Sequence, residues 1–145
     1  MADYNAVCRT NYFRVTDEAR LRDLIARCVS GEVIGVQLFQ SKADKELFAF
    51  GCYSGLPSLT CEACGEQDGY NCDSCQVLCR ELQKIVAGDD AIIITEVGND
   101  KLRYLSASSL IITKKEIQVV QLDNAAQEAA GVMLNNPSYY TQMEY

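Results

Sequence analysis

Apolar residues recur every three to four positions in three stretches of the chain, a spacing that predicts amphipathic helices. The first helix follows an N-cap at Thr16, ends near Gly31 and has one apolar face, made of Leu21, Leu24, Ile25 and Cys28. The second extends over residues 72–87. An alanine-rich third helix begins with a cap at Asp123 and ends near residues 135–137.

Runs of β-branched and aromatic residues predict strands between these helices. They cover residues 11–16, 33–40, 46–54, 91–97, 101–106, 110–113 and 117–122. Short polar connections predict hairpins at residues 41–45, at Gly98-Asn99-Asp100 and at Lys114-Lys115. This order of elements predicts a single α+β domain, residues 1–145, with a mainly antiparallel sheet and two to three helices on one face.

Residues 55–76 have no periodicity and contain two Cys-x-x-Cys pairs with seven residues between them. Each pair can bring two sulfurs to one ion, and Gly65 permits the tight backbone turn that follows the first pair. The second pair begins the second helix, whose dipole favours thiolate there. We therefore predict an inserted loop before the second helix that binds a structural zinc ion through Cys61, Cys64, Cys72 and Cys75.

The spacing of the cysteines leaves alternatives open. The ion could be iron, the pairs could form disulfides or act in thiol redox chemistry, or they could bind nothing. Cys79 lies one helical turn beyond Cys75 and is either a substitute ligand or, by default, a buried core residue. Cys8, Cys28 and Cys52 stand alone in the sequence, and we interpret them as small buried hydrophobic residues.

The chain contains no histidine, which excludes Ser-His-Asp and Cys-His nucleophile pairs and every metal site with an imidazole ligand. It also has no Gly-rich phosphate loop and no Gly-x-Ser-x-Gly turn. Glu96 and Asp100 could pair as carboxylates, but a turn at residues 98–100 favours a solvent-facing position for both. We therefore expect that the protein is not an enzyme.

The net charge of −7 is concentrated in one part of the chain. Residues 61–100 contain nine acids against two bases, whereas residues 1–60 and 101–145 are each neutral. Such a segment repels phosphate and favours a basic protein partner, so we expect no direct contact with nucleic acid. The acids either solvate the surface or contact that partner; the residues are Glu62, Glu66, Asp68, Asp73, Asp89 and Asp90. A weaker basic group is interleaved with acids: Arg9, Arg14, Arg20, Arg22 and Arg27.

The N-terminus lacks the basic and apolar regions of a secretory signal. No apolar run approaches the roughly 20 residues that span a bilayer. We therefore expect a cytoplasmic protein with no membrane contact. In a reducing cytosol, paired cysteines are more often metal ligands or redox centres than structural disulfides, which favours the zinc interpretation.

Several segments resemble a family of small proteins carried on bacterial plasmids, conjugative elements and phages. They are Cys8-Arg-Thr-Asn-Tyr-Phe-Arg-Val-Thr16, Gly98-Asn-Asp-Lys-Leu-Arg-Tyr104, Lys114-Lys-Glu-Ile117, Met133-Leu-Asn-Asn-Pro137 and the closing Thr-Gln-Met-Glu-Tyr. The resemblance covers most of the chain, and it implies an acidic loop between the first hairpin and the second helix. This chain departs from that pattern by carrying the two cysteine pairs there.

Small acidic proteins of mobile elements often act on host defence, so the resemblance implies an anti-CRISPR or antirestriction role. Our leading hypothesis is a zinc-binding inhibitor that contacts a basic CRISPR or restriction nuclease through its acidic segment. One alternative is an accessory or regulatory scaffold of the mobile element, with purely structural zinc and contacts through the sheet or the tyrosine-rich tail. Another is a Cys-x-x-Cys thiol redox protein. The tail is either flexible or a strap across the sheet.

Overall fold

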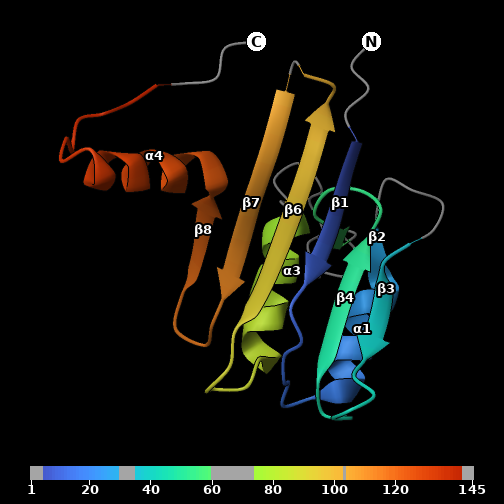
Figure 1. Ribbon diagram of the computed structural model, residues 1–145. Helices are drawn as coiled ribbons and strands as arrows, with labels where there is room; N and C mark the ends of the chain where they lie inside the picture. Colours follow the sequence, from blue (N-terminus) through green and yellow to red (C-terminus); the bar gives the residue numbers. More distant parts are fainter. Residues whose placement is uncertain (1–4, 30–34, 60–73, 103, 142–145) are drawn as a thin grey trace.

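The computed structural model describes residues 5–29, 35–59, 74–102 and 104–141 (Figure 1). Its elements, in chain order, are β1 (Asn5–Thr10), α1 (Glu18–Arg27), β2 (Cys28–Val29), β3 (Gln37–Gln40), β4 (Phe48–Cys52), β5 (Ser58–Leu59), α3 (Ser74–Ile85), β6 (Ile92–Asp100), β7 (Tyr104–Ile112), β8 (Ile117–Gln121) and α4 (Leu122–Met133). None of the helices in these ranges combines the length and apolar composition that crossing a membrane requires.

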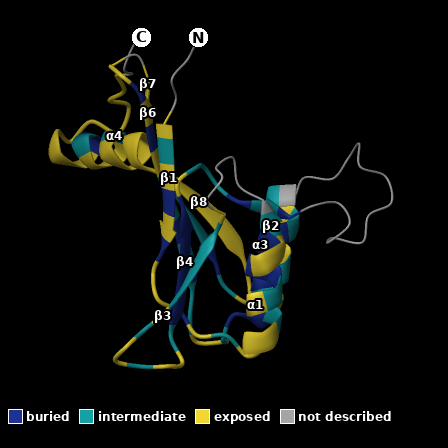
Figure 2. Cartoon of the chain, turned by 90° about the vertical axis from the view of Figure 1, so that its right-hand side faces the viewer, coloured by how far each residue is buried: buried dark blue, intermediate teal, exposed yellow. Residues whose placement is uncertain are grey.

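Six strands form one sheet in the order β3-β4-β1-β6-β7-β8, and every neighbouring pair is antiparallel. Strands β2 and β5 form a separate two-stranded ribbon. Helices α1 and α3 cover one face of the large sheet, whereas α4 lies on the other side (Figure 2). The predicted α+β fold with a mainly antiparallel sheet is therefore confirmed, with two of the helices on one face.

Helix α1 begins one residue later than the sequence predicts, because Asp17 and not Thr16 is its N-cap. The Asp17 carboxylate accepts a hydrogen bond from the Arg20 amide at 3.0 Å. The helix also ends before Gly31, because Cys28 is already extended and pairs with Leu59 of β5. Three residues of its predicted apolar face, Leu21, Leu24 and Ile25, are buried in the helix, whereas the fourth, Cys28, belongs to β2.

The first strand lies before the predicted segment 11–16, which itself makes only two isolated bridges, at Phe13 and Val15. The reason is the Asn11 side chain. Its amide donates to the Ala91 carbonyl at 3.0 Å and its carbonyl accepts from the Ile93 amide at 2.8 Å. The Asn11 side chain thus occupies backbone groups of residues 91 and 93 that a longer β1–β6 ladder would use, and the ladder ends at Thr10.

The predicted turn at Gly98-Asn99-Asp100 is wrong, because the β6–β7 ladder continues through it to the pair Asp100–Tyr104. The chain reverses from Lys101, which has a φ of 51°. The two predicted strands 101–106 and 110–113 are consequently one strand, β7. The predicted hairpins over residues 41–45 and at Lys114-Lys115 are confirmed as the β3–β4 and β7–β8 pairs.

The hydrophobic core lies between the sheet and the two covering helices. It includes Phe13 and Phe50, whose rings meet edge to face at 6.2 Å between centroids. The other fully buried large side chains come from both layers: Leu21, Leu24, Leu59, Leu78, Leu82, Ile92, Ile94, Ile112, Val86 and Pro57. The core therefore draws on residues from Cys8 to Ile112, which favours cooperative unfolding of this part of the chain.

The hydroxyl of Thr10 is a buried polar group on which the β1–β4 junction depends. It accepts a hydrogen bond from the Phe50 amide at 3.0 Å and donates to the Asn11 carbonyl at 2.8 Å. We predict that Thr10→Val lowers the free energy of unfolding by about 1–3 kcal/mol, because the Phe50 amide loses its acceptor. Urea denaturation measures this change.

Thr10→Ser is the matched control, since it keeps the hydroxyl and removes one methyl group, for a loss of about 1 kcal/mol or less. Equal destabilisation by both substitutions would show that the hydrogen bond has no special weight.

Candidate functional site

The four predicted metal ligands follow β5 in the sequence, and the last of them belongs to α3. Cys75 is in the first turn of α3, whereas Cys61, Cys64 and Cys72 fall outside the described residues. Strand β5 and helix α3 contact each other, so the chain leaves and re-enters the described framework in one region. No group of cysteines and carboxylates within the described ranges is arranged to hold a metal ion. The four-cysteine zinc site therefore stays a prediction.

Four cysteines lie on the helix-facing side of the sheet, and we call them the thiol cluster: Cys8 on β1, Cys52 on β4, Cys28 on β2 and Cys75 on α3. Cys8 and Cys52 are directly opposite each other on β1 and β4, and their thiols interact. The thiols of Cys28 and Cys75 are close enough to interact electrostatically with Cys52 and Cys8 respectively. The Cys52 thiol also donates to the Gly55 carbonyl at 3.3 Å.

Burial keeps two of these thiols, Cys8 and Cys28, protonated. It raises the pKa of Cys8 to about 12, with smaller contributions from the Cys52 thiol and the Glu96 carboxylate. Burial and Cys52 likewise raise the pKa of Cys28 to about 12. A neutral buried thiol is a poor nucleophile, so these residues act as small hydrophobic groups. The interpretation as buried hydrophobic residues is confirmed for Cys8 and Cys52, whereas Cys28 is only partly buried and packs against the core. Cys79 is a core residue, 4% exposed.

Glu96 is a carboxylate whose position differs from the sequence expectation. It lies opposite Cys8 on β6, half-buried on the helix-facing side, and a Cβ at Gly55 would lie 3.1 Å from its Oε1 atom. Asp100 is buried as well. The alternation of buried Ile92 and Ile94 continues to both carboxylates, so the strand period was the signal that could have placed them inside.

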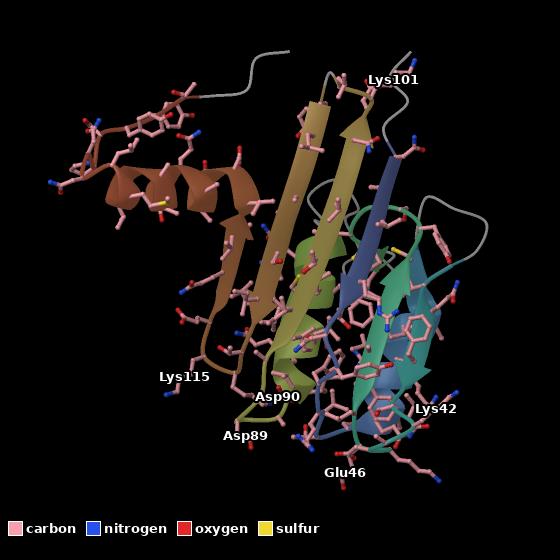
Figure 3. All side chains as sticks on the ribbon, viewed as in Figure 1. Lys42, Glu46, Asp89, Asp90, Lys101 and Lys115 are labelled. Atoms are coloured by element: carbon pink, nitrogen blue, oxygen red, sulfur yellow. The ribbon has the colours of Figure 1, made fainter. Side chains whose placement is uncertain are left out.

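Two of the six predicted partner-binding acids, Asp89 and Asp90, belong to the described residues. Asp89 and Asp90 lie at the exit of α3, at the end opposite Cys75 and about 18 Å away by the helix rise (Figure 3). Asp90 accepts hydrogen bonds from the amides of Arg14 and Ala91, both at 2.8 Å, so its carboxylate shapes the turn. Asp89 is exposed. The remaining four, Glu62, Glu66, Asp68 and Asp73, lie outside the described residues.

The described residues are nearly neutral and internally paired. They contain 13 acids and 12 bases, a net charge of −1 in a chain of −7. Four of the five arginines of the predicted basic group are in ion pairs: Arg14 with Asp44, Arg20 with Asp23 and Glu81, Arg22 with Glu18, and Arg27 with Asp23. The fifth, Arg9, stacks on the Phe39 ring at 4.5 Å.

Glu81 is the most strongly engaged carboxylate of this network. Its hydrogen bond with Lys84 lowers its pKa, and a second hydrogen bond, with Arg20, acts in the same direction against partial burial. This pairing fastens α3 to α1 at 3.1 Å between Arg20 and Glu81. The carboxylate therefore serves helix packing, and it is held in its ionised form.

The tail lies against α4, and its described part does not strap across the sheet. Gln127 donates to the Thr141 carbonyl and accepts from the Thr141 amide. An open hollow between α4 and the tail is lined chiefly by amides and tyrosines, among them Asn124, Tyr139 and Tyr140, with Glu128 as its one carboxylate within the described chain. Nothing in this hollow resembles an acid–base pair.

The chain matches no protein-family model, and comparison with curated proteins and with solved structures gives no match either. The candidate site is therefore judged on its own residues.

We predict one zinc ion per chain in protein purified without chelator, measured by elemental analysis. Serine at Cys61, Cys64, Cys72 or Cys75 should abolish stoichiometric binding, since a closed site needs all four thiolates. Cys79→Ala is the control and should keep the metal, because this thiol is buried in the core. Wild-type protein without stoichiometric metal would refute the prediction. Stoichiometric iron would show that the site binds iron and not zinc.

The Cys8 thiol predicts a dependence of stability on alkaline pH. The pKa of Cys8 in the folded protein, about 12, lies above the ordinary value of 9.0. The stability that the protonated thiol contributes is therefore complete below pH 9 and is lost as the pH rises towards 12. The destabilisation caused by Cys8→Ala should therefore shrink by about 1.4 kcal/mol between pH 8 and pH 10. Urea denaturation with reductant, at both pH values, measures it. A constant difference between the two proteins would contradict the prediction.

Proposed function

We propose that this protein is a non-catalytic inhibitor that binds a basic, nucleic-acid-handling host nuclease of the CRISPR or restriction type. The proposed contact is the first part of the charged stretch 61–100. From here on we call residues 60–73 the acidic segment, which carries Glu62, Glu66, Asp68 and Asp73 and no base. The observation that supports this choice is the near-neutrality of the described framework, with its 13 acids against 12 bases. Most of the excess negative charge is therefore in a single segment.

The ion pairs of the framework support this choice as well. Most of the carboxylates on α1 and the β3–β4 hairpin are already used by neighbouring arginines, as in the Arg14–Asp44 pair at 2.9 Å. The segment connects β5 to α3, and these two elements contact each other. A concentrated charge of one sign speeds encounter with an oppositely charged surface.

Zinc has a defined part in this proposal. Bound by Cys61, Cys64, Cys72 and Cys75, it fixes the backbone of the acidic segment before the partner is met. Fixing the segment in advance lowers the conformational entropy lost on binding. The ion is thus structural, and the acids make the contact.

The ionisable groups with shifted pKa values favour binding over catalysis. The thiols of Cys8 and Cys28 have pKa values near 12, and the pKa of Glu81 is lowered. General acids and bases work best with pKa values near the operating pH, and these shifts move away from it.

An accessory scaffold of a mobile element is the second candidate function. It is favoured by large apolar side chains that the described structure leaves exposed on the open face of the sheet, such as Val7, Val97 and Leu105, which are 51%, 45% and 57% exposed. Such a protein would contact other components through the sheet and would not need the acidic segment.

The test is survival of a target plasmid in bacteria whose CRISPR or restriction nuclease cleaves it. Expression of the wild-type chain should raise survival. The variant Glu62→Gln/Glu66→Gln/Asp68→Asn/Asp73→Asn should lose at least about tenfold of that protection, because the steering charge is gone. Affinity purification from the same cells identifies the nuclease that is bound.

The control variant Glu18→Gln/Glu46→Gln/Glu116→Gln/Glu128→Gln removes the same charge from exposed framework positions and should protect normally. Equal protection by both variants would exclude the acidic segment as the contact. Recovery of transfer or replication proteins in place of a nuclease would favour the scaffold.

A further inference from the structure

Strand β8 is an edge of the large sheet that lacks the usual protection. All five of its residues, Ile117–Gln121, are exposed, and the sequence Ile-Gln-Val-Val-Gln has no charge and no proline. Its ladder with β7 is continuous from Ile117 to Gln121, so no bulge twists the edge away. Native proteins usually blunt an edge with one of these devices, because an open edge offers unpaired amides and carbonyls to another strand.

Helix α4 leaves the top of this edge and runs away from the body of the protein (Figure 1). It buries only Gly131, whereas its apolar residues Leu122, Val132 and Met133 are 63%, 82% and 85% exposed. Its axis passes beyond β8 on the side of the sheet opposite α1 and α3 (Figure 2). An apolar helix in that position covers no part of its own core, and it is placed to cover a neighbouring sheet that continues from β8.

We propose that two copies of this chain associate by antiparallel pairing of their β8 strands, centred on Val119. The two sheets then form one continuous sheet around a two-fold axis, with α1 and α3 of both copies on the same face. This inference goes beyond the proposed function and does not depend on it, because the acidic segment takes no part in the pairing.

Charge complementarity supports a second copy as the occupant and sets the register. Lys115 stands four residues before Val119, and Asp123 stands four residues after it. Antiparallel pairing about Val119 places Ile117 of each copy opposite Gln121 of the other, so the turn that carries Lys115 meets the first turn of the other copy's α4, which carries Asp123. Both side chains are exposed, and neither forms an ion pair with a described residue. Figure 3 shows Lys115 pointing away from its own sheet at the lower end of β8.

The same arrangement gives α4 something to cover. A helix of 12 residues is about 18 Å long, and strands lie about 4.8 Å apart, so α4 reaches across three to four strands of the other copy. The open face there carries Ile93 and Ile111, which are opposite each other on β6 and β7 and only half-buried. The exposed apolar residues of α4 can pack on this face, and the contact is made twice by symmetry.

The opposite edge of the sheet is less suited to such a contact. On β3, Phe39 is engaged by the guanidinium of Arg9, and the Gln40 side chain donates to the Lys45 carbonyl. The strand has four residues against five in β8. Pairing through β8 alone also closes at two copies and does not propagate into a fibre.

The test is sedimentation equilibrium of the full chain under reducing conditions, at concentrations up to about 100 µM. The wild type should have twice the monomer mass of 16.1 kDa. Val119→Lys places two like charges at the two-fold axis and should raise the dissociation constant roughly 100-fold. Tyr53→Lys is the control and should dimerise normally, because Tyr53 is similarly exposed, at 62%, and follows β4, which lies beyond the strands that α4 can reach. Circular dichroism confirms that both variants are folded.

The register has its own test. Lys115→Glu and Asp123→Lys should each raise the dissociation constant about tenfold, since each introduces like charges twice. The double variant should restore wild-type association. A monomeric wild type, a dimer that Val119→Lys leaves intact, or assemblies larger than two copies would each overturn the proposal. A double variant as weak as its parents would refute pairing about Val119.

Discussion

The central position of β1 is the constraint on which the rest of the structure depends. It is the first strand in the chain, yet it lies between β4 and β6, so Cys8 is opposite Cys52 on one side and Glu96 on the other. The sheet cannot form until these distant segments meet, and the entropy of closing both loops must be offset by the core they complete. The thiol cluster and its neighbouring carboxylate are a direct product of this arrangement.

Two polar side chains then decide where β1 ends. The Thr10 hydroxyl accepts a hydrogen bond from the Phe50 amide. The Asn11 side chain donates to the Ala91 carbonyl and accepts from the Ile93 amide. The β1 ladder therefore ends at Thr10, isolated bridges follow at Phe13 and Val15, and the chain enters α1 through the Asp17 cap. Side chains that replace ladder hydrogen bonds leave no buried backbone group without a partner, which lets a strand stop inside a well-packed region.

This framework separates two kinds of surface. Its own charges are nearly balanced by ion pairs, which leaves the acidic segment between β5 and α3 as the main source of net charge. The β8 edge and α4 carry apolar side chains and little charge. A charged surface gives fast and salt-sensitive encounter, whereas an uncharged edge gives backbone pairing between like molecules. The proposed nuclease contact and the proposed self-association therefore use different surfaces and need not compete.

Several features of the protein follow from the sequence alone because they depend on near neighbours. The apolar face of α1, the hairpins around residues 41–45 and Lys114-Lys115, the buried character of Cys8 and Cys52, and the uneven charge are all readable from local spacing and composition. The tertiary structure alone decided the order of the strands, the end of β1 at Thr10 and the inward position of Glu96. It also placed α4 beyond the β8 edge. Each of these depends on hydrogen-bond or packing partners remote in sequence, and a local pattern carries no information about which distant segment will supply them.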